Sequence, residues 1–272
     1  MRRRPAPAKL NLALVVGPPG ADGRHALTTV LQRIDLCDRL ELRAAPALAV
    51  RGFDGDTLVS AALTSLAAAA GVEPRWAATL EKRIPVAAGL GGGSSDAATA
   101  LRLANEALDR PLGREALHRL AAALGADVPF FLEDGPQLGE GDGTQLSPLD
   151  LPQDYWVAVV LPADVRKDST GAVYRQFDQR SGAEGYEERR RHLRAALAEA
   201  RRPRDLALLP PNDLASSPLA ANLLELGAFR ADVTGSGPAV YGLFLHEQEA
   251  RTALRRLRPL GRTWLAVPAW YG

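Results

Sequence analysis

The feature that most constrains this chain is a run of small residues between an apolar strand-like segment and an apolar helix-like segment. It reads Pro85-Val86-Ala87-Ala88-Gly89-Leu90-Gly91-Gly92-Gly93-Ser94-Ser95-Asp96-Ala97-Ala98. Because glycine has no side chain, this backbone can bend sharply and bring several N–H groups toward one point. We expect the helix to begin at Ser94 or Ser95, so that its unbonded N–H groups and its positive dipole end face the loop. This arrangement is typical of a phosphate-binding site.

The alternative for this segment is a flexible turn with a serine helix cap, but the apolar flanks on both sides favour phosphate binding. Several better-known motifs are excluded. A Walker A loop needs a lysine directly after a glycine, and none of Lys9, Lys82 and Lys167 meets that condition. The dinucleotide pattern fails because Ser94 stands in place of its third glycine, and the His-Arg-Asp and Asp-Phe-Gly motifs of protein kinases do not occur.

Composition limits the class of partner. The chain has 33 basic and 32 acidic residues, whereas proteins that bind mainly nucleic acid or anionic membranes usually have a clear basic excess. The single cysteine, Cys37, excludes an internal disulfide and a cysteine-rich metal site. No apolar run suits a signal peptide or a membrane span. We therefore expect a cytoplasmic monomer or weak homodimer that binds a small molecule, and neither nucleic acid nor a membrane.

Hydrophobic periodicity predicts alternating strands and helices. Strands are predicted at residues 10–16, 38–43, 47–51, 76–85, 155–161, 231–234, 239–245 and 264–267. Helices are predicted at residues 58–70, 94–108, 115–124, 187–201 and 247–257, with Gly125 as a left-handed cap. Prolines at positions 148 and 152 suggest a boundary. The pattern therefore predicts an α+β protein with one domain over residues 1–150 and a second over residues 151–272.

Two further residues have the chemistry that phosphoryl transfer to an alcohol requires. Lys9 lies at the mouth of the first predicted strand, and Asp127 follows a predicted helix. A carboxylate can accept or orient the proton of a hydroxyl, and an ammonium stabilises charge on the transferred phosphoryl group. Taken singly, Lys9 also suits a solvated lysine and Asp127 a loop aspartate. Lysine is rare in this arginine-rich chain, which slightly favours a specific use of each ammonium.

A second turn of small residues, Asp232-Val233-Thr234-Gly235-Ser236-Gly237-Pro238, predicts a β-hairpin. Its glycines raise the question of whether it packs against the first loop. The four histidines are scattered, with no pair four residues apart, so we predict no histidine metal site.

Three segments together resemble the ordered motifs of the GHMP small-molecule kinases. They are residues 7–12, 85–98 and 233–237, and the motifs extend over nearly the whole chain. The segment Gly125-Ala126-Asp127-Val128-Pro129-Phe130-Phe131 is similar to that of members acting on a cytidine diphosphate-linked methylerythritol in the non-mevalonate isoprenoid route. The resemblance implies a two-domain GHMP kinase fold, with an ATP-binding and catalytic N-terminal domain like that of ribosomal protein S5 and a C-terminal domain like an α/β-plait. It also implies that ATP with Mg²⁺ phosphorylates the 2-hydroxyl of this substrate.

The resemblance also implies roles for individual residues. Lys9 and Asp127 would be the catalytic pair. The substrate would contact Asn11, Arg24, His25, Thr170 and Tyr174, with Arg24 standing where the family usually has a tyrosine that stacks on cytosine. ATP would be bound by Pro85, Val86, Ala87, Ala88, Gly89, Leu90, Gly91, Gly92, Gly93, Ser94 and Ser95. Metal ligands and adenine contacts stay unassigned.

Two other interpretations stay open at this point. The first is a GHMP kinase for mevalonate, phosphomevalonate or homoserine, against which residues 125–131 and His25 argue. The second is a nucleotide-binding module without catalysis, against which the presence of Lys9 and Asp127 argues.

Overall fold

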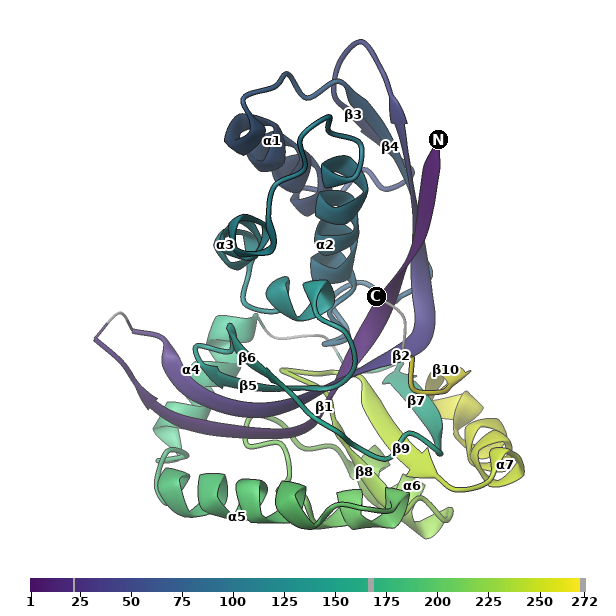
Figure 1. The fold of residues 1–272 in the computed structure, drawn as a ribbon. Coiled ribbons are helices and arrows are strands. Elements are labelled where there is room, and N and C mark those ends of the chain that lie inside the picture. Colours follow the sequence, from purple (N-terminus) through teal and green to yellow (C-terminus); the bar gives the residue numbers. More distant parts are fainter. Residues whose placement is uncertain (22, 166–168, 270–272) are drawn as a thin grey trace.

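Two β-sheets with helices packed against them make up the fold (Figure 1). The computed structural model describes residues 1–21, 23–165 and 169–269. The first sheet contains β1 (Arg2–Pro19), β2 (His25–Ala44), β3 (Ala49–Arg51), β4 (Trp76–Glu81), β5 (Gln137–Gly141) and β6 (Gln145–Pro148). The second contains β7 (Trp156–Pro162), β8 (Arg230–Val233), β9 (Val240–Phe244) and β10 (Gly261–Ala266), in the order β10-β7-β9-β8.

β1 and β2 form a long antiparallel ribbon through the middle of the molecule (Figure 1). On its other edge β2 pairs with β4 and with β5. Residues 6–17 of β1 are all buried, and they include the polar residues Lys9 and Asn11. Buried polar groups require hydrogen-bond partners, so the surroundings of these two residues must be specific.

Three helices pack together beside the first sheet. α1 (Leu58–Ala70) buries a stripe with the spacing of an amphipathic helix, namely Val59, Ala62, Leu63, Leu66 and Ala67. α2 (Gly92–Asn105) packs against α1 and α3 (Arg114–Leu124) and contacts β1 and β2. From Ser95 onward all of α2 except Arg102 is buried, which its many alanines permit because small side chains allow close packing. The short 3₁₀ helix η1 (Pro129–Leu132) follows α3.

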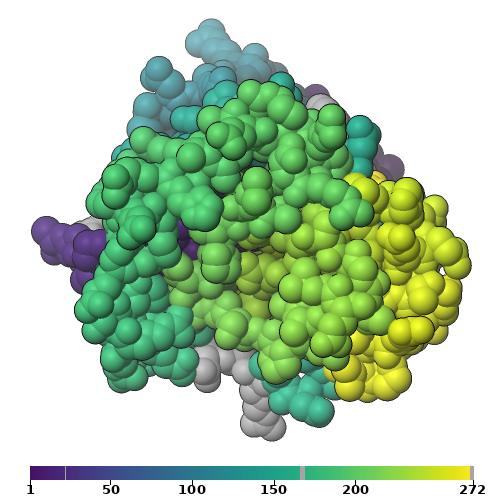
Figure 2. Space-filling view, turned by 90° about the horizontal axis from the view of Figure 1, so that it is seen from below, coloured from purple at the N-terminus to yellow at the C-terminus, as the bar shows by residue number. Residues whose placement is uncertain are grey.

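The second half of the chain forms the lower face of the molecule, seen directly in Figure 2. Its helical elements are α4 (Thr170–Gln179), α5 (Tyr186–Glu199), η2 (Pro203–Leu208), α6 (Pro218–Glu225), α7 (Glu247–Leu257) and η3 (Arg258–Leu260). α6 and α7 pack on the second sheet, whereas α5 packs on β1. None of the helices in the described part of the chain is long and apolar enough to cross a membrane.

The α+β class is confirmed, and most predicted elements are present. The helices at residues 58–70 and 247–257 have the predicted ends, and β8 and β9 pair as the predicted hairpin. The prediction for Gly125 was wrong, because its φ of 164° is extended backbone and not left-handed. The prediction also missed β5, β6, α4 and α6. The domain boundary at residue 150 stays a prediction. One apolar core contains residues from both sides of this position.

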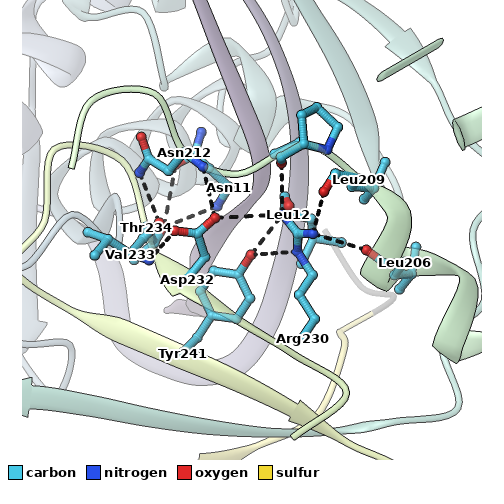
Figure 3. Close-up of polar contacts among 12 residues, drawn as sticks. Asn11, Leu12, Leu206, Leu209, Asn212, Arg230, Asp232, Val233, Thr234 and Tyr241 are labelled. Carbon is cyan, nitrogen blue, oxygen red and sulfur yellow. Dashed lines mark hydrogen bonds and ion pairs between the residues drawn. The ribbon is translucent and has the colours of Figure 1, made fainter. Parts of the chain in front are cut away.

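A buried arginine ties the second sheet to the segment before α6 (Figure 3). Arg230 of β8 lies 3.6 Å from the carboxylate of Asp232. Its guanidinium donates hydrogen bonds to the carbonyl oxygens of Leu206 (3.2 Å), Leu209 (2.7 Å) and Pro210 (2.9 Å). One planar side chain therefore satisfies backbone carbonyls of η2 and of the segment that follows it.

Asn212 continues this network to the turn after β8. Its backbone N–H donates to Asp232 at 2.8 Å. Its side-chain amide donates to the carbonyl oxygens of Val233 at 2.9 Å and Gly235 at 2.7 Å. These bonds hold the turn in one conformation (Figure 3).

We predict that Arg230→Met lowers the free energy of unfolding by about 3 kcal/mol, because it leaves buried carbonyls and Asp232 without a cation. Urea denaturation measures the effect. Arg251→Met is the control, since Arg251 forms an exposed pair with Glu247 on α7, and we expect a change below about 0.5 kcal/mol. Equal stabilities of the two variants would contradict the importance of the Arg230 network.

Candidate functional site

A cleft of about 490 Å³ lies between the two halves of the chain. The first half contributes Lys9, Asn11, Asp127 and every residue from Pro85 to Ser94. The second half contributes Thr170 and Tyr174 from α4, together with Leu214, Gly235 and Ser236. Most of the residues singled out in the sequence therefore meet around one cavity.

The glycine-rich loop ends at Gly91, because α2 begins two or three residues before the predicted start at Ser94 or Ser95. Gly91 has a φ of 69°, in the left-handed region that favours glycine, and α2 begins at Gly92. The Ser95 N–H donates to the Gly91 carbonyl at 2.9 Å. The N–H groups of Gly92, Gly93 and Ser94 consequently precede the helical hydrogen-bond ladder. These residues line the cleft at the positive end of the helix dipole, where an anion is stabilised.

The loop is packed tightly against the turn between β8 and β9. Gly89 has a φ of 85°, and a Cβ atom there would lie 2.3 Å from the carbonyl oxygen of Thr234. The Ala239 N–H donates to the carbonyl of Ala88 at 3.0 Å. The glycines thus allow the two turns to make direct backbone contact, which answers the question left by the sequence.

Lys9 and Asp127 lie side by side at the floor of the cleft. The Lys9 Nζ atom is 3.5 Å from Asp127 Oδ2 and donates a hydrogen bond to Asn11 Oδ1 at 2.5 Å. The Lys9 backbone N–H donates to the carbonyl of Leu90 at 2.9 Å, which joins β1 to the loop. The lysine side chain is 4% exposed and the aspartate side chain 41% exposed. A fixed ammonium therefore lies beside a carboxylate that is open to the cleft.

Asn11 links this pair to the second half of the chain. Its side-chain amide donates to Thr29 Oγ1 at 2.8 Å, and its backbone N–H donates to Thr234 Oγ1 at 3.0 Å. Figure 3 shows Asn11 beside Thr234. A Cβ atom on Gly235 would lie 3.3 Å from Lys9 Nζ. The turn after β8, which Asn212 holds, therefore also sets the space available to the ammonium.

At another part of the cleft, α4 presents Thr170 and Tyr174. The rings of Tyr174 and His25 have centroids 4.8 Å apart and are inclined by 33°. His25 Nε2 lies 2.8 Å from Asp178 Oδ1. Burial, with the nearby Asp127 carboxylate, raises the pKa of Tyr174 to about 12, so this hydroxyl stays protonated.

Arg24 lies on the outer side of the same region. Its guanidinium is 2.7 Å from Asp142 Oδ2, and Asp142 lines the cleft. Tyr174 and Asp142 line the cleft directly. His25 lies one layer further out, against Tyr174, and Arg24 does so against Asp142. Ser95 likewise lies behind the wall, fully buried. The predicted binding roles of these residues stay predictions.

A cluster of charged side chains beside the loop was not apparent from the sequence. It consists of Asp38 from β2, Lys82 after β4, and Asp96 in α2. Lys82 and Asp96 also line the cleft. The rarity of lysine was the one signal in the sequence that pointed to Lys82, but nothing there indicated its partners.

Comparisons with known proteins identify the family of this chain. The model of the GHMP kinases N-terminal domain matches residues 57–135, and that of the GHMP kinases C-terminal domain matches residues 214–262. The 4-diphosphocytidyl-2-C-methyl-D-erythritol kinase of Anaeromyxobacter sp. (strain Fw109-5) is 40% identical over 267 residues, covering 93% of this chain and 85% of the relative.

Solved structures are similar over the full chain. A 4-(cytidine 5'-diphospho)-2C-methyl-D-erythritol kinase superimposes with a TM-score of 0.80 and 33% identity, covering 98% of this chain and 99% of the other. The mevalonate kinase of Methanococcus jannaschii has a TM-score of 0.74 with 13% identity, at 98% coverage of both chains, and shares the fold alone. From the extent and level of these matches, the chain belongs to the 4-diphosphocytidyl-2-C-methyl-D-erythritol kinases within the GHMP kinase family.

Proposed function

We propose that this chain transfers the γ-phosphoryl group of ATP to the 2-hydroxyl of 4-diphosphocytidyl-2-C-methyl-D-erythritol, a step of the non-mevalonate route to isoprenoid precursors. The observation that carries the proposal is the meeting of Lys9 and Asp127, distant in sequence, at 3.5 Å beside the glycine-rich loop. A relative named for this substrate is 40% identical, whereas the mevalonate kinase is 13% identical. This difference favours the cytidine-linked substrate over mevalonate.

The loop and the helix start form the proposed ATP site. Amides of Gly92, Gly93 and Ser94 would donate to phosphate oxygens, because they precede the helical ladder and line the cleft. The backbone contact between Gly89 and Thr234 keeps the loop close to the second half of the chain. Such preorganised donors stabilise phosphate charge without having to reorient during the reaction.

The catalytic pair acts on the two reacting groups. The substrate oxygen attacks the γ-phosphorus as the bond to the β-phosphate oxygen breaks, and ADP leaves. Asp127 orients the hydroxyl or accepts its proton, and its exposure on the cleft side suits contact with an incoming alcohol. Lys9, held by Asn11, stabilises negative charge on the transferred group.

Mg²⁺ is expected to accompany ATP, since it commonly bridges phosphate oxygens and neutralises their charge. In the described part of the chain no group of three or more His, Cys, Asp or Glu residues could hold a metal ion. Mg²⁺ usually takes only one or two protein carboxylates. We therefore expect phosphate oxygens and water to supply most of its ligands. No residue is assigned as its ligand.

The cytidine end of the substrate is assigned to the region around α4. Tyr174 presents a ring at the cleft wall, with His25 stacked behind it and Thr170 one turn away. Arg24 offers a planar guanidinium next to Asp142. Action in the cytoplasm as a monomer or weak homodimer, without nucleic acid or a membrane, stays a prediction.

The direct test is ADP release from Mg-ATP in the presence of different alcohols. We expect kcat/KM with 4-diphosphocytidyl-2-C-methyl-D-erythritol to exceed that with mevalonate, phosphomevalonate or homoserine by at least about 100-fold, because only the first can use the α4 region. Stimulation by mevalonate and not by the cytidine substrate would overturn the assignment.

We predict that Lys9→Met and Asp127→Asn each lower kcat by about 10²- to 10⁴-fold while the KM for ATP changes less than about threefold. Steady-state kinetics measure both values. Asp134→Asn is the control, since that carboxylate follows η1 and its side chain is 85% exposed. Near-normal turnover in either active-site variant would remove the role assigned to that residue.

We predict that Gly89→Ala weakens ATP binding by at least about tenfold, because the methyl group would clash with the Thr234 carbonyl and Gly89 is left-handed. Calorimetry measures the affinity. Gly113→Ala is the matched control, because a Cβ atom there meets nothing within 4 Å and its φ is −70°. An unchanged affinity in Gly89→Ala would argue against ATP binding at this loop.

A further inference from the structure

A cluster of three charged side chains lies beside the glycine-rich loop, and two of them, Lys82 and Asp96, also line the cleft. The side chains of Asp38, Lys82 and Asp96 are 0%, 14% and 1% exposed. The Lys82 ammonium donates to both carboxylates, and its distance to Asp96 Oδ2 is 2.7 Å. Burying three charges is costly unless their arrangement is specific. The proposed phosphoryl transfer does not itself use any of them.

The cluster ties the entrance of the loop to its exit. Asp38 Oδ1 accepts the backbone N–H groups of Arg83 at 2.5 Å and Ile84 at 2.8 Å, and these residues lead into the loop. Lys82 carries the connection from Asp38 to Asp96, which lies in α2 just after the loop. Both ends of the loop are therefore fixed to one carboxylate on the long strand β2.

Lys82 also lies close to the start of α2. A Cβ atom on Gly92 would lie 3.3 Å from Lys82 Nζ. The amide of Gly92 is one of those assigned to phosphate binding. Because the ammonium lies close to this residue, we expect a shift of Lys82 to change the position of the amide. The cluster would then act on the anion site through the backbone.

The charge of the cluster is unbalanced, since two carboxylates surround one ammonium. Asp96 Oδ1 is buried and has no hydrogen-bond partner among the described residues. Burial and the neighbouring Asp38 carboxylate raise the pKa of Asp96 to about 7, against the opposing effect of Lys82. A proton on Asp96 makes the cluster neutral. Its loss places a net negative charge behind amides that receive a polyanion.

We propose that Asp38, Lys82 and Asp96 are positioning residues for nucleotide binding, and that the triphosphate binds more tightly when Asp96 is protonated than when it is ionised. The inference rests on the proposed function, in which the loop binds the phosphates of ATP. It adds that a buried salt-bridge cluster both fixes the loop and makes its affinity depend on pH.

The first test compares ATP affinity and steady-state constants in Asp38→Asn, which keeps the side-chain size. At pH 6, where a proton on Asp96 already makes the unchanged cluster neutral, we expect Kd and KM for ATP to rise about tenfold because the Asp38–Lys82 ion pair is lost. KM for the cytidine substrate should change less than about twofold. Glu81→Gln is the control, since that residue ends β4 in an exposed pair with Arg83 and should leave all constants unchanged. Unchanged ATP affinity in Asp38→Asn would overturn the positioning role.

The second test uses the coupling between Lys82 and Asp96. Lys82→Met leaves two buried carboxylates without a cation, so we expect a large loss of ATP affinity. Adding Asp96→Asn removes one of those charges and should restore affinity by about tenfold relative to Lys82→Met alone. A double variant that binds ATP no more tightly than Lys82→Met alone would contradict the electrostatic coupling.

The third test needs only a mild variant that preserves size and fold. In the unchanged protein we expect ATP affinity, measured by calorimetry, to fall about tenfold between pH 6 and 8.5, as Asp96 loses its proton. Asp96→Asn should show only the pH dependence that comes from ATP itself. Parallel profiles for the two proteins would overturn the pH inference. Absence of ATP binding by the unchanged protein at any pH would instead contradict the proposed function.

Discussion

The site depends on backbone amides facing a cleft without side chains in the way. This is possible because two glycines have no side chain. Gly89 lies against the Thr234 carbonyl, and Gly91 has a left-handed conformation directly before α2, which begins at Gly92. A branched residue at either position would separate the loop from the turn after β8 or change the direction of the helix. Binding of a polyanion is then a property of main-chain geometry, supported by the helix dipole.

β1 brings the remaining chemistry to this point. It passes through the middle of the molecule and carries Lys9. The backbone N–H of Lys9 binds the loop at Leu90, and its side-chain ammonium lies beside Asp127. On the other side, the Arg230 and Asn212 network holds the turn that limits the space around the Lys9 ammonium. The two halves of the chain therefore define one site jointly, which suits a reaction that must bring a nucleotide and an alcohol together.

Residues with unusual local chemistry were predictable from the sequence, whereas their spatial relations were not. The glycine run and the amphipathic helix α1 follow from local rules. β5 was missed because its sequence is rich in glycine and polar residues, and it is a strand through its pairing with β2 and β6. The helix start was misplaced because Gly91 and not a serine forms the cap. Lys82 was not recognised as part of a cluster, since Asp38 comes from a different strand.

The most direct measurement is a crystal structure of the chain with a non-hydrolysable ATP analogue and 4-diphosphocytidyl-2-C-methyl-D-erythritol. The account predicts phosphate oxygens within hydrogen-bond distance of the Gly92, Gly93 and Ser94 amides, and a terminal phosphate between Lys9 and the substrate hydroxyl beside Asp127. A triphosphate bound away from the start of α2, or a substrate hydroxyl out of reach of Asp127, would contradict it.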